Sequence, residues 1–85
     1  MATRKQQTAP RDVLATNVRV HRAAAGLSQE SLAERSGIKR SYIGAIERAE
    51  VDVRLSTLAK VADGLGIEPF RLLIAADRQL RALPD

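Results

Sequence analysis

One face of a predicted helix carries small and hydrogen-bonding side chains that could read the edges of DNA bases. At 100° of rotation per residue, this face lies opposite the apolar face of the same helix. Ser41, Gly44, Ala45 and Arg48 lie on this face, with Arg40 on its flank, and the candidates for reading bases are Arg40, Ser41, Gly44 and Ala45. Arg40 could donate to N7 and O6 of guanine, Ser41 could donate or accept, and Ala45 could touch a thymine methyl group. Gly44 costs about 1 kcal/mol inside a helix, which close approach of DNA or simple indifference at an exposed site would explain equally well.

Polar residues near the predicted helix starts could contact phosphates. Lys39 directly precedes the third predicted helix and Arg54 the fourth, and a helix start offers unpaired N–H groups and the positive end of the helix dipole. Arg35 and Arg48 are further candidates. For any one of these residues, a solvated surface charge is an equally good interpretation. Tyr42 could pack against the second helix or place its hydroxyl on a phosphate.

The elements that position these residues are all predicted to be helices. Apolar residues recur at spacings of three and four, and no useful segment alternates with a period of two. The first helix follows Pro10, Ser28 is a suitable N-cap for the second, and the fifth runs from Pro69 to about Leu83. Helix-ending glycines stand at Gly26, Gly37 and Gly66. We therefore expect one all-α domain of five helices.

The spacing within residues 29–46 indicates a helix-turn-helix. Counted from Gln29, the fourth, fifth, ninth, tenth, fifteenth and eighteenth positions hold Leu32, Ala33, Gly37, Ile38, Ile43 and Ile46. Ala33 is small where the next helix must cross, and Gly37 can take the left-handed conformation that ends a helix in a tight turn. In this arrangement the second helix of the pair is free to enter a major groove. A plain helical hairpin inside another bundle is the alternative.

The run LSQESLAERSGIKRSYIGAIE, followed by LSTLAKVADGLGI, resembles the phage repressor and Cro family, the XRE-type helix-turn-helix proteins. Within that family it is most similar to small single-domain regulators such as controller proteins of restriction-modification systems. The resemblance covers about residues 14–75. It implies a five-helix domain that binds double-stranded DNA as a homodimer, in a sequence-specific transcription regulator with a palindromic operator. Regulation of its own promoter is compatible with it, but repression and activation leave the same marks in the sequence.

The resemblance also assigns roles to single residues. It implies that Gln29, at the start of the second helix, binds a phosphate. It places Arg22 opposite Glu47, and we expect a partly buried salt bridge that fixes the reading helix. His21 stands at a core-facing position and is expected to be a half-buried structural residue. Helix-capping positions usually held by Ser, Thr or Asp carry Lys39, Arg54 and Glu68 here. Ala49 replaces the usual glycine after the third helix.

The fifth predicted helix carries two apolar stripes that one domain core cannot cover. The first stripe consists of Phe70, Leu73 and Ile74. The second consists of Leu72, Ala76, Leu80 and Leu83. We predict that the second stripe is the dimer interface. Packing of this stripe on the domain's own N-terminal arm or first helix is the alternative.

Composition bounds the remaining possibilities. The chain has 85 residues and a net charge of +4, which allows one small domain at 11–83 after a loose polar arm at 1–10. The arm is either a frayed terminus or a segment that reaches a DNA groove. Cysteine is absent and one histidine is present, so we expect no metal site and no cofactor. We find no nucleophile–base set or paired carboxylates, and predict that the protein is not an enzyme.

The expected localisation follows from the absence of a membrane span and of a signal peptide in the sequence. No apolar run approaches the length of a membrane span and no signal core is seen, so we expect a cytoplasmic protein with no membrane partner. RNA polymerase or another protein is a further candidate partner. The alternative function is an antitoxin-like interaction module that also binds DNA.

Overall fold

The computed structural model describes residues 9–75. Within that range the chain forms four α-helices and one short 3₁₀ helix, and no strand. The elements are α1 (Pro10–Ala24), α2 (Gln29–Ser36), α3 (Arg40–Glu47), α4 (Leu55–Leu65) and η2 (Pro69–Leu73). The predicted all-α class is therefore confirmed for this part of the chain. No helix in the described range is long and apolar enough to cross a membrane.

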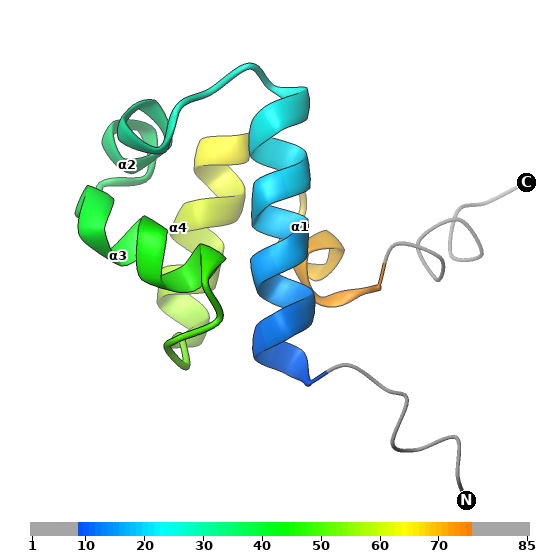
Figure 1. Cartoon of the computed structure of the whole chain (residues 1–85). Coiled ribbons are helices and arrows are strands. Elements are labelled where there is room, and N and C mark those ends of the chain that lie inside the picture. Colours follow the sequence, from blue (N-terminus) through cyan, green and yellow to red (C-terminus); the bar gives the residue numbers. More distant parts are fainter. Residues whose placement is uncertain (1–8, 76–85) are drawn as a thin grey trace, which may run out of the picture.

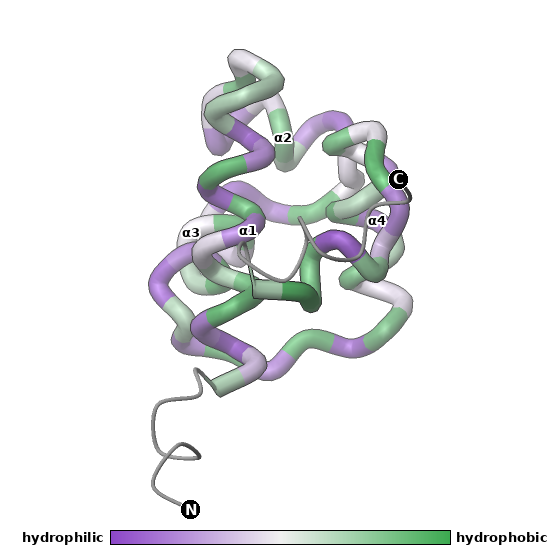
Figure 2. Tube along the Cα trace, turned by 90° about the vertical axis from the view of Figure 1, so that its right-hand side faces the viewer, coloured by the Kyte–Doolittle hydropathy of each residue, from purple (hydrophilic) through white to green (hydrophobic). Residues whose placement is uncertain are grey.

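Helix α1 lies between α3 and η2. It packs against α3 on one side and against η2 on the other, while α2 packs on α3 and α4 (Figure 1). Hydrophobic and hydrophilic residues are interspersed along the helices (Figure 2). The buried hydrophobic side chains form one core. The fully buried large side chains of this core are Leu32, Ile43, Ile46, Leu72, Val18 and Val61. The core thus ties α3 to α1 and α2 through its two isoleucines.

The turn between α2 and α3 forms as its residue types predict. Ser28 caps α2 by accepting a hydrogen bond from the backbone N–H of Ser31 at 2.9 Å. Gly37 ends the helix in the left-handed conformation with φ of 70°, and Ile38 packs against the core. Gly64 on α4 lies so close to Ser36 that a Cβ there would collide with the serine hydroxyl. This close crossing explains why α4 carries a glycine inside a helix.

The predicted fifth helix is wrong as a single element. A helical segment does begin at Pro69, but it is a 3₁₀ helix of five residues, and Ile74 is extended with φ of −110° and ψ of 127°. The side-chain amide of Asn17 donates to the carbonyl oxygens of Leu72 at 3.0 Å and Ile74 at 2.9 Å. These bonds hold the carbonyls of η2 toward α1. Residues 76–83 of the predicted helix lie outside the described residues.

The predicted division of this segment into a core stripe and a dimer stripe is wrong where it can be checked. Leu72, expected at the dimer interface, is completely buried in the domain's own core, whereas Phe70 is 50% and Leu73 48% exposed. Leu72 faces away from Phe70 and Leu73 in a 3₁₀ helix as it would in an α-helix, but here the Leu72 face is the one turned to the core, where Asn17 binds the carbonyls of Leu72 and Ile74. Other members of the predicted dimer stripe, Ala76, Leu80 and Leu83, lie outside the described residues.

Two departures from good helix-end chemistry have visible consequences. Lys39, Arg54 and Glu68 hold the N-cap positions of α3, α4 and η2, and none makes a side-chain capping hydrogen bond. After α3, Ala49 adopts φ of 59°, the left-handed region in which the usual residue is glycine. The N–H of Ala49 donates to the carbonyl of Ile46, and the N–H of Glu50 to that of Ala45. This is the Schellman motif, completed here by a strained alanine.

Candidate nucleic-acid interface

The outward surface of α3 is less open than the sequence suggests. Arg40 and Ser41 are exposed and Ala45 is half-buried, but Gly44 is buried. A Cβ on Gly44 would lie 3.1 Å from Nη1 of Arg48 and 3.9 Å from Oε1 of Gln29. The close approach that the glycine permits is therefore, in the free protein, made by the chain's own polar side chains. The interpretation of Gly44 as an exposed position that tolerates glycine is therefore wrong, because Gly44 is buried.

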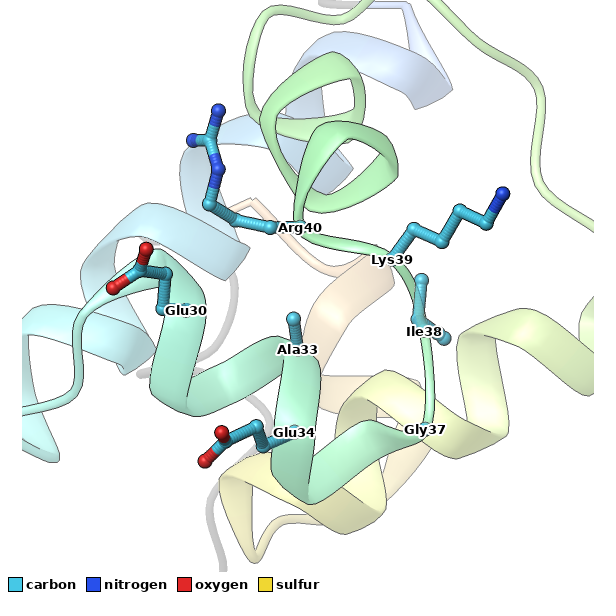
Figure 3. Close-up of a pocket in the computed structure, with 7 residues that line it drawn as sticks. All are labelled: Glu30, Ala33, Glu34, Gly37, Ile38, Lys39 and Arg40. Atoms are coloured by element: carbon cyan, nitrogen blue, oxygen red, sulfur yellow. The ribbon is translucent and has the colours of Figure 1, made fainter.

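The start of α3 presents basic side chains on both sides of the turn. Lys39 and Arg40 are both exposed, and their side chains point in different directions from the first residues of the helix (Figure 3). They border a shallow depression at the turn, which Figure 3 shows with the outward-pointing carboxylates of α2. Its lining residues are Glu30, Ala33, Glu34, Gly37, Ile38, Lys39 and Arg40. The positive side chains thus lie toward α3 and the negative ones on α2.

Arg22 and Glu47 meet as the resemblance implies. Nε of Arg22 donates to Oε2 of Glu47 at 2.6 Å, and Nη2 donates to Oε1 at 3.0 Å. The side chain of Glu47 is only 4% exposed and that of Arg22 is 22% exposed. Nη1 of Arg22 also donates to the carbonyl of Leu27. The pair is therefore bidentate and partly buried, and it fastens the last turn of α3 to α1.

The surroundings of Glu47 keep its carboxylate charged. Burial by itself would raise the pKa of Glu47, but hydrogen bonds from Arg22 and Gln29 and the nearby charge of Arg19 outweigh it, so the pKa is lowered. The hydrogen bond to Glu47 in turn raises the pKa of Arg22. Both changes stabilise the ionised pair.

Arg19 is a site residue that the sequence reasoning missed. Its Nη1 donates to the backbone carbonyl of Glu47 at 2.6 Å, at the C-terminal end of α3. A cation there satisfies a carbonyl without a helical partner and offsets the negative end of the helix dipole. The available signal was its position three residues before Arg22, which puts both arginines on the same side of α1.

Gln29 lies between Glu47 and Arg40. Its Nε2 donates to Oε1 of Glu47 at 2.9 Å, and its Oε1 accepts from Nη1 of Arg40 at 2.8 Å. The side chain predicted to bind a phosphate is therefore already engaged on both sides.

Three further candidates have partners or packing within the domain. Nε of Arg35 donates to the carbonyl of Gly64 at 2.7 Å, at the end of α4. Arg48 pairs with Glu50 at 3.0 Å on the surface, and this hydrogen bond lowers the pKa of Glu50. Tyr42 is half-buried and packs against the core. Arg35 and Tyr42 therefore have structural roles within the domain that do not depend on nucleic acid.

His21 is half-buried, as the sequence analysis expects. Burial, together with the positive charge of Arg71, lowers its pKa below the ordinary value for histidine. A histidine kept neutral by its surroundings is consistent with a structural role. Within the described residues no group of His, Cys, Asp or Glu side chains is arranged to hold a metal ion.

The arrangement of α2, a tight glycine turn and α3 is one that known proteins share. Residues 18–72 match the helix-turn-helix family HTH_3, which has the XRE or Cro/C1 type of domain. The chain belongs to this helix-turn-helix family. Members of the family are DNA-binding transcription regulators, and the chain's relatives are regulators of that kind.

Individual members of the helix-turn-helix family resemble most of the chain. The control protein C.SmaI of Serratia marcescens is 49% identical over 63 residues, which are 74% of this chain and 75% of that protein. The crystal structure of a hypothetical transcription factor from Neisseria has a TM-score of 0.83 at 37% identity, over 88% of this chain and 86% of that one. The restriction-modification controller protein C.AhdI from Aeromonas hydrophila has a TM-score of 0.73 at 43% identity, over 76% and 98% of the two chains.

Proposed function

We propose that the protein is a sequence-specific transcription regulator that binds a palindromic DNA operator as a homodimer. The observation that carries the proposal is the outer side of α3, where exposed Arg40 and Ser41 and half-buried Ala45 stand on a helix seated firmly by its opposite face. A rigid helix with short side chains and a flanking arginine suits direct readout in a major groove. Membership of the helix-turn-helix family supports the same proposal.

In this proposal, phosphate contacts position the protein and base contacts select the sequence. Lys39 and Arg54 stand at helix starts whose N–H groups have no side-chain cap, so a phosphate can supply the missing acceptor. Arg48 lies at the far end of α3 and can exchange Glu50 for a phosphate. Arg40 donates to a guanine, and Ser41 and Ala45 contact neighbouring bases. Regulation of its own gene is included in the proposal.

The dimer is proposed on the surface of η2. Phe70 and Leu73 together expose apolar surface on this short segment, each to about half of its area. Burying them against a second copy would stabilise the pair by removing that surface from water. Ala76, Leu80 and Leu83 remain proposed as further contacts. Two-fold symmetry would then place the two α3 helices roughly 34 Å apart, in successive major grooves.

The proposal is tested by selecting bound duplexes from a random pool at about 0.15 M salt, with wild type and Arg40→Ala in parallel. The expected result is a palindrome with half-site centres about one helical turn apart, and loss of preference at one position per half-site in the variant. Arg11→Ala is the matched control, because it removes the same charge from the first turn of α1. If no sequence is enriched and binding only fades with salt, the proposal fails.

A further inference from the structure

The guanidinium of Arg48 lies over the proposed reading helix in the unbound protein. A Cβ built on Gly44, one turn earlier on α3, would be 3.1 Å from Nη1 of Arg48 and 3.9 Å from its Cζ. The arginine side chain therefore runs back along α3. It covers the turn between Ser41 and Ala45, which the proposed function places against the bases. The side chain is 61% exposed, so burial in the core does not hold it there.

Glu50 holds Arg48 in this position. Its Oε2 accepts a hydrogen bond from Nε of Arg48 at 3.0 Å. Because Nε is part of the planar guanidinium, this bond restrains the orientation of the whole group. On a regular helix, side chains two residues apart point to different sides. The pair therefore depends on the change of chain direction that follows α3.

Ala49 supplies that change of direction. Its left-handed φ of 59° turns the chain, and the N–H of Glu50 donates to the carbonyl of Ala45 at 3.0 Å. The backbone of Glu50 is thereby attached to the last turn of α3, beside Arg48. The strained conformation of Ala49 thus comes with a fixed placement of the Glu50 carboxylate.

A carboxylate is unfavourable at this place for two reasons. Glu50 follows the C-terminal end of α3, where the helix dipole is negative and favours cations. It also lies beside a surface proposed to meet the phosphates of DNA, where a negative charge lowers affinity. Neither helix stability nor DNA affinity therefore accounts for Glu50, whereas its pairing with Arg48 does.

We propose that Glu50 is a specificity-determining residue, which acts as an intramolecular substitute for phosphate and keeps Arg48 over Gly44 until α3 enters a matching groove. The inference rests on the proposed function and deepens it. On unrelated DNA the helix is not pressed against the bases, so Arg48 stays with Glu50 and makes no phosphate contact. On the preferred sequence, close approach at Gly44 displaces the guanidinium, which then exchanges Glu50 for a phosphate. Glu50 thus withholds one cation from non-specific binding.

The salt dependence of binding distinguishes the two positions of Arg48. Each phosphate contact adds about 0.9 to the slope of the logarithm of the binding constant against that of the salt concentration. In wild type, Arg48 contributes to that slope on the preferred duplex alone. In Glu50→Gln the arginine has lost its anionic partner and contributes on every duplex.

The experiment measures dissociation constants of the preferred duplex and of an unrelated duplex between about 0.05 and 0.3 M salt. The proteins are wild type, Glu50→Gln, Arg48→Met and the double variant. On the unrelated duplex, we expect Glu50→Gln to steepen the salt slope by about 0.9 and to tighten binding about fivefold at about 0.15 M salt. On the preferred duplex, the slope should stay as in wild type and binding should tighten about twofold, the worth of an exposed ion pair.

Asp52→Asn is the matched control. It removes the same charge from the same loop and breaks an exposed ion pair of the same length, 3.0 Å, between Asp52 and Arg11. Arg11 belongs to the first turn of α1 and has no part in the proposed DNA contacts, so this variant should change both duplexes equally. Because Glu50 acts through Arg48, Glu50→Gln in the Arg48→Met background should do no more than Asp52→Asn does.

Each other outcome has a definite meaning. Equal tightening of both duplexes by Glu50→Gln, an unchanged salt slope on the unrelated duplex, or the same effect with and without Arg48 overturns the role of Glu50 and leaves the proposed function standing. A wild type that binds the two duplexes with equal affinity overturns the proposed function itself, and this is visible before any variant is made.

Discussion

The two ends of α3 are held in opposite ways. At the C-terminal end, Arg19 binds the carbonyl of Glu47, Arg22 binds its carboxylate, and Ala49 completes a Schellman motif. At the N-terminal end, Lys39 occupies the cap position and gives the helix no side-chain acceptor. One end is satisfied by the protein itself, and the other keeps donors without a side-chain partner. The difference suggests that the C-terminal end of α3 fixes the position of the helix, while the N-terminal end keeps its N–H donors for an external anion.

The largest effect is expected from cutting the anchor at the C-terminal end. Arg22→Ala would leave the buried Glu47 carboxylate without its bidentate partner and should lower the free energy of unfolding by about 3 kcal/mol. Urea denaturation measures it. Arg11→Ala serves as the control, because the Arg11–Asp52 pair is exposed and should contribute less than about 1 kcal/mol. Equal losses in the two variants would show that the Arg22–Glu47 pair anchors the C-terminal end of α3 no more strongly than an exposed ion pair does.

Acid should weaken the same end. Because the pKa of Glu47 is lowered in the folded state, its stabilising contribution is complete above the ordinary glutamate pKa of about 4.3 and is lost as the pH falls through the lowered value. Stability measured against pH should fall less steeply below about pH 4.3 in Glu47→Gln than in wild type. The exposed Glu50→Gln is the matched control and should change the slope less. A larger change of slope in Glu50→Gln than in Glu47→Gln would show that Glu47 is not the carboxylate responsible for the loss of stability in acid.

The next effect concerns the carbonyl at the end of α3. Arg19→Met keeps most of the apolar stem but removes the charged donor to Glu47, and should cost about 1.5 kcal/mol of stability. Thermal unfolding monitored by circular dichroism is sufficient. An unchanged melting temperature would mean that solvent replaces the guanidinium without loss.

Relieving the strain after α3 should work in the opposite direction. Ala49→Gly removes the penalty of a left-handed alanine, about 1–2 kcal/mol, at the expense of extra freedom in the unfolded chain, about 0.5–1 kcal/mol. We expect a net gain of about 0.5–1 kcal/mol in the free energy of unfolding. Ala25→Gly, which replaces an exposed alanine with negative φ, should give no gain. A destabilised Ala49→Gly would contradict the left-handed conformation.

The smallest change in stability is expected at the N-terminal end. Lys39→Ser supplies the missing cap and should stabilise the protein by about 0.5 kcal/mol. The same substitution should weaken DNA binding and make it less dependent on salt, by about one counterion. Titrations at several salt concentrations measure both quantities. Gain of stability without loss of DNA affinity would show that this end is not reserved for a phosphate.

Local chemistry made the fold up to the end of α3 predictable. The cap at Ser28, the turn at Gly37 and the apolar spacing up to Ile46 act within a few residues of each other, so a sequence pattern contains them. The end of η2 is different, because it involves the amide of Asn17, more than fifty residues away. A helical period read beyond Pro69 could not include that contact, and it assigned Leu72 to the wrong surface.

The candidate site likewise contains residues whose placement follows from local sequence and others whose placement depends on distant contacts. The exposed positions of Arg40, Ser41 and Lys39 were predictable because they follow from the motif, and the Arg22–Glu47 pair was predictable because a resemblance supplied it. The engagement of Gln29 and the cover over Gly44 were missed, since both depend on where long side chains settle after the helices have packed. Backbone periodicity places a Cβ but leaves the end of a glutamine or arginine undetermined.

The contacts of Asn17 also impose an order on synthesis. Residues 17 and 74 must both have left the ribosome before the amide can meet its two carbonyls, and Leu72 fills the core at the same stage. Until then, α1 lacks η2 as a packing partner. A nascent chain that already contains the whole of α3 therefore still lacks part of the core. Emergence of residues 72–74 from the ribosome, which comes well after their synthesis, is therefore the step at which the core that supports α3 can first be completed.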